Sequence, residues 1–138
     1  MLVATYGSLK RGFHNHGFIK DSKFLGVDSL SGFAMYKYSS FPMVVASDDI
    51  NDTIMVEVYE VSADTLVRLD YLEGHPEFYR RVHVDTIYGD AFIYIGSRNQ
   101  IREGMKKIEN GVWKQSDVNH IYSNVKGRYR DWETVNLS

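Results

Sequence analysis

Short runs of alternating apolar and polar residues recur along most of the chain and predict β-strands. The clearest run covers residues 53–61, TIMVEVYEV, in which both alternating sets of positions carry apolar side chains. This pattern is typical of a strand that is largely buried on both faces. Shorter apolar runs, bounded by glycine, proline or polar clusters, predict further strands at residues 2–6, 24–30, 33–38, 43–46, 79–87 and 91–95.

Two pairs of these runs are close enough in sequence to form hairpins. The first pair meets at Ser31-Gly32, and the second meets at Tyr88-Gly89-Asp90. Glycine in a short connection between two apolar runs favours a tight turn, so each pair is predicted to be antiparallel.

One amphipathic helix is predicted between residues 53–61 and the last pair of strands. Ser62 has the side chain of an N-cap, and leucines recur at helical spacing at positions 66, 69 and 72. Gly74 and Pro76 are expected to end the helix, because glycine adopts the left-handed cap and proline cannot continue the hydrogen-bond ladder. One clear helix among many short strands predicts an α+β domain on a curled, mostly antiparallel or mixed sheet.

The pattern after Gly96 is weaker. Residues 101–108 are interpreted as a short helix, and Gly111 is predicted to lie in a turn. Further apolar residues share a helical stripe, namely Val118, Ile121, Tyr122, Val125 and Tyr129. No repeat or linker divides the sequence, so residues 1–138 are expected to form a single domain. Residues 114–138 are a C-terminal extension whose structure the sequence does not specify.

Composition narrows the possible functions. The 138 residues suit one ordinary domain, and the net charge of −2 provides no field that would attract nucleic acid or an anionic membrane. The absence of cysteine excludes disulfides, thiolate metal sites and a cysteine nucleophile. The first apolar run is too short for a signal peptide or a membrane span, so a cytoplasmic protein without nucleic-acid or membrane partners is expected.

Glu73 stands where the predicted helix meets a Gly-His-Pro break. Unsatisfied carbonyls at a helix C-terminus disfavour a further negative charge, and apolar neighbours would also raise the pKa of this carboxyl from about 4.3. An acid shifted in this way can accept and return a proton. The spacing alone favours the alternative, an exposed glutamate that forms a surface ion pair with Arg80 or Arg81, because most glutamates are solvated.

A second candidate site is the stretch 6-YGSLKRG-12, directly after the first predicted strand. If Gly7 adopts a positive φ next to the small Ser8, successive backbone N–H groups can converge on an anion. A nucleotide-binding loop is excluded, because Phe13 and His14 stand where such a loop needs lysine and serine or threonine. An ordinary strand-ending turn is the alternative interpretation.

Other groupings of polar residues are weaker. His14 and His16 lack a third ligand. Asp48, Asp49 and Asp52 lack the spacing and the closing glutamate of a calcium loop. No metal is therefore expected.

Three motifs occur in a characteristic order along the chain. They are an early strand that ends in Tyr6-Gly7-Ser8-Leu9, a central Phe41-Pro42-Met43, and the segment Leu69-Asp70-x-Leu72-Glu73-Gly74-x-Pro76-x-x-Tyr79-x-Arg81. Together they resemble the gamma-glutamylcyclotransferase superfamily, in the branch that includes gamma-glutamylamine cyclotransferase and the AIG2-like proteins. The likeness runs from about Leu2 to Tyr94, with a further match at residues 107–113. It implies a small mixed, β-barrel-like sheet with flanking helices.

The resemblance also implies an activity without cofactors. Members of this family convert a γ-glutamyl amine or γ-glutamyl amino acid to 5-oxoproline and a free amine by intramolecular aminolysis. By resemblance, Glu73 is the general base and acid, and the substrate is bound by Tyr6, Gly7, Ser8, Leu9, Phe41, Pro42, Tyr79 and Tyr94. Backbone N–H groups of residues 6–9 would hold the α-carboxylate of the substrate. Glutathione is not the expected substrate, since the glutathione-specific members carry different motifs.

Two other functions stay open on the sequence. A non-enzymatic protein of the same fold would bind a small carboxylate or a partner protein through its cavity, although Glu73 would then add a second carboxylate to the site. A hydrolase would need a group that positions water, and the sequence does not identify one. The sequence also does not choose between a monomer and a homodimer.

Overall fold

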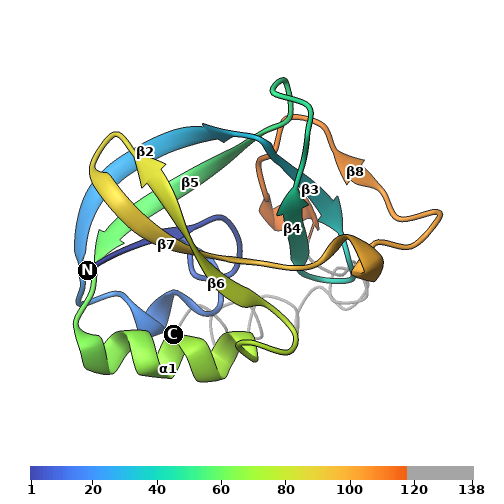
Figure 1. The fold of residues 1–138 in the computed structure, drawn as a ribbon. Coiled ribbons are helices and arrows are strands. Elements are labelled where there is room, and N and C mark those ends of the chain that lie inside the picture. Colours follow the sequence, from blue (N-terminus) through green and yellow to red (C-terminus); the bar gives the residue numbers. More distant parts are fainter. Residues whose placement is uncertain (118–138) are drawn as a thin grey trace.

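The computed structural model describes residues 1–117, which form two β-sheets and one α-helix (Figure 1). Three short 3₁₀ turns complete the described secondary structure: η1 (His16–Phe18), η2 (Arg98–Gln100) and η3 (Gln115–Asp117). The predicted α+β class is confirmed. The helical stripe that begins at Val118 and most of the C-terminal extension lie outside the described residues.

The larger sheet has five strands in the order β2-β5-β1-β7-β6. Their bounds are β2 (Lys23–Ser31), β5 (Thr53–Glu60), β1 (Leu2–Thr5), β7 (Gly89–Ile95) and β6 (Arg80–Thr86). β1 runs parallel to β7 and the other neighbouring pairs are antiparallel, so the sheet is mixed, as expected. The predicted hairpin of β6 and β7 is confirmed, with Thr86 paired to Gly89.

β5 is the strand that was predicted to be buried on both faces, and it lies between β2 and β1. Ile54, Val56 and Val58 enter one hydrophobic cluster, whereas Tyr59 enters the other. All four residues are almost completely buried. Successive side chains of a strand point to opposite faces, which is why apolar residues at both sets of positions join two parts of the core.

The smaller sheet corrects the first predicted hairpin. Its order is β4 (Pro42–Ala46), β3 (Phe33–Lys37) and β8 (Lys107–Ile108). Strands β2 and β3 exist as predicted, but β2 pairs with β5, and β3 pairs with β4 and β8. Gly32, at φ +85°, turns the chain from one sheet into the other; its N–H donates to the Asp52 carbonyl and its own carbonyl accepts from the Ser47 N–H. The two sheets do not close into a barrel.

Helix α1 (Ala63–Glu73) has the predicted bounds and caps. The Ser62 hydroxyl accepts from the Thr65 N–H at 3.1 Å, and Gly74 ends the helix in the left-handed conformation at φ 65°. Leu66 and Leu69 pack into the same cluster as Tyr59, so the helix covers one face of the larger sheet (Figure 1). Its length is 11 residues, and within residues 1–117 no helix is long and apolar enough to cross a membrane.

The segment after β7 differs from the predicted short helix at residues 101–108. It contains η2, then a turn in which Gly104 has φ +90°, and then β8, which pairs with β3. The sequence interpretation was wrong because Lys107 and Ile108 obtain their backbone partners from a strand far away in the chain. The turn predicted at Gly111 is confirmed by its φ of 67° and by the hydrogen bond from its N–H to the Ile108 carbonyl.

Candidate active site

A cavity of about 420 Å³ lies between the loop after β1, the residues that lead into β4, and the C-terminal end of α1. All nine residues that the sequence selected for the site line this one cavity: Tyr6, Gly7, Ser8, Leu9, Phe41, Pro42, Glu73, Tyr79 and Tyr94. They come from four separate segments of the chain. The fold therefore brings together the three motifs that carried the family resemblance.

Glu73 is the last residue of α1, and its side chain lines the cavity. The residue as a whole is half-buried, but the protein around the carboxyl removes enough water to raise its pKa from 4.5 to about 7. Among residues 1–117, no hydrogen bond or ion pair to this carboxyl offsets the loss of water. Near neutral pH the Glu73 carboxyl therefore exists in both protonation states. A group that acts first as a general base and then as a general acid needs both of these states.

The alternative of a surface ion pair is not what the structure shows. Arg81 binds the carboxylate of Asp70, with 2.6 Å between Nη1 and Oδ2, and Arg80 is exposed. The guanidinium of Arg81 also lies over the ring of Phe92. Both contacts hold Arg81 away from Glu73, which leaves desolvation as the cause of the raised pKa.

The loop of residues 7–9 presents backbone N–H groups that have no protein acceptor within residues 1–117. Gly7, Ser8 and Leu9 lie outside the strands, and their N–H groups donate to no backbone or side-chain oxygen of the described chain. Gly7 and Leu9 are buried. Buried N–H groups are nearly always paired, so a set of unpaired donors that lines a cavity is suited to an anion.

The role of Gly7 differs from the one predicted. Gly7 is not among the residues with positive φ. Instead, a Cβ at this position would lie 2.8 Å from Cγ and 3.2 Å from Cδ of Pro42. Glycine is required because the loop passes directly against the ring of Pro42, not because the backbone is left-handed.

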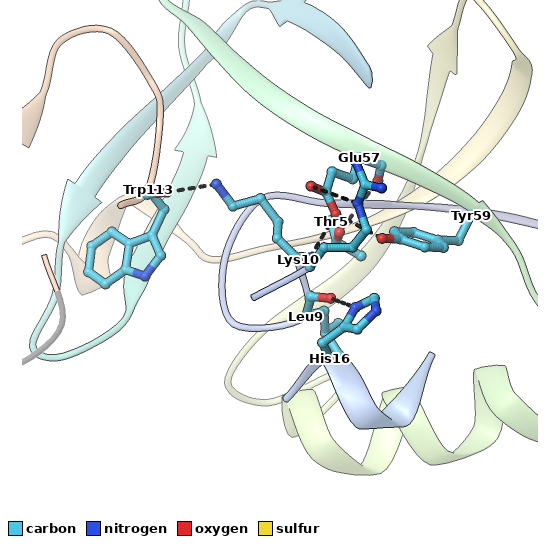
Figure 2. Close-up of polar contacts among 8 residues, drawn as sticks. Thr5, Leu9, Lys10, His16, Glu57, Tyr59 and Trp113 are labelled. Carbon is cyan, nitrogen blue, oxygen red and sulfur yellow. Dashed lines mark hydrogen bonds and ion pairs between the residues drawn. The ribbon is translucent and has the colours of Figure 1, made fainter. Parts of the chain in front are cut away.

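Neighbouring residues hold this loop through hydrogen bonds to its carbonyl groups and to the Ser8 hydroxyl. Asn15 donates from Nδ2 to the Ser8 hydroxyl at 2.8 Å and from its backbone N–H to the Ser8 carbonyl at 2.9 Å. The imidazole of His16 contacts the Leu9 carbonyl through Nδ1 at 2.9 Å (Figure 2). These bonds use the Ser8 and Leu9 carbonyls as acceptors, while the N–H groups of residues 7–9 donate to no protein acceptor within residues 1–117.

Lys10, which follows this loop directly, connects it to Trp113 near the end of the described residues. Its ammonium donates to the Trp113 carbonyl at 2.7 Å (Figure 2). The same ammonium lies 4.9 Å from the centre of the Phe13 ring. Burial lowers the pKa of Lys10, while Glu57 and Asp117 act in the opposite direction. The loop is thus fixed in position before any ligand arrives, which is the condition for effective preorganised donors.

Tyrosine hydroxyls connect the walls of the cavity. Tyr79 donates to the Pro42 carbonyl at 2.6 Å, and Tyr6 donates to the Tyr94 carbonyl. Burial raises the pKa of both hydroxyls, with Glu73 adding to the effect, so they stay protonated. Their protons are used within the protein, which favours the wall role of Tyr79 over that of a proton donor to a ligand.

Asp70 and Tyr94 link α1 to β7. The Tyr94 hydroxyl donates to Oδ1 of Asp70 at 2.6 Å, and the other carboxylate oxygen binds Arg81. Since Tyr94 also accepts the hydrogen bond from Tyr6, one continuous set of bonds runs from the end of β1 to the last turn of α1. This network sets the spacing between the loop donors and Glu73.

Several lining residues were not selected from the sequence: His14, Asn15, Tyr71 and Phe78. Phe78 lies inside the third motif at a position where the motif is unspecified, and Tyr71 is a helix residue with 90% of its side chain exposed. Neither position carries a local signal. Within residues 1–117, no group of three His, Asp or Glu side chains is arranged to hold a metal ion.

Comparison with known proteins agrees with the geometry. The family described as gamma-glutamyl cyclotransferase, AIG2-like, matches residues 3–115. YtfP of Escherichia coli K12, named a gamma-glutamylcyclotransferase family protein, is 32% identical over 117 residues, covering 85% of this chain and 99% of its own. A Methanocaldococcus jannaschii protein, named provisionally as a gamma-glutamylcyclotransferase, is 47% identical over 87 residues, covering 62% of this chain and 71% of its own.

Solved structures show the same fold. An uncharacterized protein from Pyrococcus horikoshii, PH0828, superposes with a TM-score of 0.69 at 32% identity, covering 81% of this chain and 88% of its own. The solution structure of YtfP from E. coli gives a TM-score of 0.64 at 32% identity, with 85% of this chain and 99% of its own covered.

Proposed function

The chain belongs to the AIG2-like gamma-glutamyl cyclotransferase family, and on this basis we propose that it converts a γ-glutamyl amine or γ-glutamyl amino acid to 5-oxoproline and a free amine. One observation supports this most directly. Glu73, whose carboxyl has a pKa of about 7, lines the same cavity as residues 7–9, whose backbone N–H groups have no protein acceptor in residues 1–117. The first can move protons, and the second can hold a carboxylate.

Binding begins at the loop of residues 7–9. Its N–H groups donate to the α-carboxylate of the γ-glutamyl group, and no cationic side chain is needed for this because backbone donors suffice. The Pro42 ring and the tyrosine walls limit how the glutamyl chain can lie. Holding the α-amino group near the γ-carbonyl of the same molecule makes the attack intramolecular, and such positioning can supply a large share of the rate enhancement.

The reaction then needs two proton transfers, and Glu73 serves both. As a carboxylate it takes a proton from the α-ammonium, whose nitrogen attacks the γ-carbonyl carbon and forms the new ring bond. As a carboxylic acid it returns that proton to the amide nitrogen, the bond between the γ-carbon and this nitrogen breaks, and the amine departs. The ring nitrogen releases its extra proton to the departing amine, so no proton is consumed. Loop N–H groups stabilise the negative oxygen of the tetrahedral intermediate.

Product analysis tests the proposal. The protein is incubated with a panel of γ-glutamyl amides, and 5-oxoproline, free glutamate and free amine are measured by mass spectrometry. Release of 5-oxoproline with an equal amount of amine supports the cyclotransferase. Free glutamate would identify a hydrolase. Binding of a γ-glutamyl compound without any product would identify the alternative, a non-enzymatic protein that binds a small carboxylate on the same fold.

A further inference from the structure

One wall of the cavity is aromatic, and its rings contact one another. The rings of Phe41 and Phe78 lie 6.0 Å apart, and Tyr38 packs against both, at 5.2 Å and 5.7 Å. Phe78 also meets Tyr79 edge to face at 4.9 Å. These rings pack in the offset and edge-to-face arrangements that aromatic pairs prefer, so they form one continuous aromatic surface.

The aromatic wall continues to the mouth of the cavity. Phe78 is 36% exposed, and Tyr71, which also lines the cavity, is 90% exposed. Exposed aromatic side chains beside a cavity are typical of a ligand-binding site. In such a site a few polar groups orient the ligand, and apolar side chains cover the rest of it. Glu73 and the loop donors provide the polar groups. The aromatic wall is available for the part of the substrate that they do not hold.

The charges around the cavity restrict that part further. Among the described residues that line it there is no lysine or arginine. Burial lowers the pKa of His14, which favours its neutral imidazole. A second carboxylate on the substrate would therefore find no lysine or arginine among these lining residues, and Glu73 would repel it whenever ionised.

On the premise of the proposed cyclotransferase activity, we infer that the departing amine is an apolar or aromatic primary amine, seated against Phe41, Phe78 and Tyr71. The γ-glutamyl group occupies the polar end of the cavity, and the amine substituent lies along the aromatic wall. An amine that also carries a carboxylate, as in a γ-glutamyl amino acid, is disfavoured at this position.

Three matched amides test the inference: γ-glutamyl-phenethylamide, γ-glutamyl-ethylamide and γ-glutamyl-phenylalanine. The first two differ by a phenyl ring, and the first and third differ by a carboxylate. We expect kcat/KM for the phenethylamide to exceed that for the ethylamide by about 10-fold or more, mainly through a lower KM, because burial of an aromatic ring is worth at least that factor. We also expect it to exceed kcat/KM for γ-glutamyl-phenylalanine by about 10-fold or more.

Variants locate the effect on the wall. Phe78→Ala should reduce the preference for the phenethylamide over the ethylamide several-fold, and Phe78→Leu should reduce it less. Ile87→Ala is the control, because Ile87 is 74% exposed and does not line the cavity; its preference should equal that of the wild type. Melting curves of each variant verify that it is folded.

The outcomes separate this inference from the proposed function. Release of 5-oxoproline from all three amides with equal kcat/KM, or a Phe78 variant that is folded and keeps the full preference, would overturn the inference and leave the cyclotransferase intact. A preference for γ-glutamyl-phenylalanine would also overturn it. If none of the three amides yields 5-oxoproline but another γ-glutamyl compound does, the inference fails and the cyclotransferase stands; if no γ-glutamyl compound yields 5-oxoproline, both fail.

Discussion

Replacement of Glu73 by glutamine should change stability and activity in opposite directions. The substitution keeps the shape of the side chain and removes its charge. The pKa of Glu73 is raised by burial from 4.5 to about 7, which means that the folded protein disfavours the ionised carboxylate. The difference between these two values corresponds to about 3 kcal/mol.

The sign follows from proton linkage. Below pH 4.5 the carboxyl is protonated in the folded and unfolded states, so it costs no stability. Between pH 4.5 and about 7 the unfolded chain ionises first, the folded state binds more protons, and the free energy of unfolding falls as the pH rises. Above about pH 7 the full cost is present. We therefore expect Glu73→Gln to match the wild type near pH 4 and to exceed its stability at pH 8 by up to about 3 kcal/mol.

Denaturant unfolding at a series of pH values between 4 and 8.5 measures this difference, and at pH 8 the melting temperature should rise by about 10 °C. Glu77→Gln is the matched control, because Glu77 is an exposed glutamate four positions away and its replacement changes the net charge equally. Over the same series, kcat of Glu73→Gln should be lower than that of the wild type by about 10²-fold or more.

Two results would refute the reasoning. Equal stability of Glu73→Gln and Glu77→Gln at pH 8 would show that the Glu73 carboxyl is not desolvated. Turnover of Glu73→Gln at the wild-type rate would show that its proton is not used in the reaction.

Three further substitutions test the surroundings of the site. Gly7→Ala places a Cβ 2.8 Å from the Pro42 ring, so the loop must move and KM should rise roughly 10-fold, in line with the usual cost of overpacking; an unchanged KM contradicts the role of this loop in binding. Tyr94→Phe removes the 2.6 Å hydrogen bond to Asp70 and should lower the free energy of unfolding by about 1–3 kcal/mol. An unchanged denaturant midpoint would contradict a stabilising role of this hydrogen bond. Gly111→Ala places a Cβ against the backbone of β5 at a φ of 67° and should cost more than about 2 kcal/mol, measured by the same unfolding experiment with Gly104→Ala, where the Cβ meets nothing within 4 Å, as the control.

The comparison of the sequence with the fold shows where local patterns succeed. The alternation in residues 53–61 correctly predicted a largely buried strand, and Ser62 and Gly74 correctly predicted the ends of α1. Side-chain period and cap chemistry act over a few residues, so they can be seen without knowledge of the fold. Pairing is different. Residues on either side of Gly32 were expected to pair with each other, but each strand found its partner elsewhere in the chain.

The same distinction applies to the site. The motif residues line one cavity, and their catalytic and binding roles stay predictions. The reason given for Gly7 was wrong, since glycine is needed there because of the distance to Pro42 and not because of the φ of the loop. Phe78 and Tyr71 were missed because nothing in their immediate sequence indicates that they line a cavity. The ion pair of Arg81 with Asp70, which leaves Glu73 unpaired among the described residues, also could not be inferred from spacing.

By itself, the sequence determined the strands, the capped helix and the absence of cysteine chemistry. It also identified the residues of the three motifs that resemble the family. Each of these depends on composition or on neighbours a few positions apart. Only the tertiary structure decided that the donors of residues 7–9 and the carboxyl of Glu73 line one cavity, and that the carboxyl is desolvated. Desolvation depends on atoms brought from distant segments, and for that reason a raised pKa is a property of the fold and not of the residue.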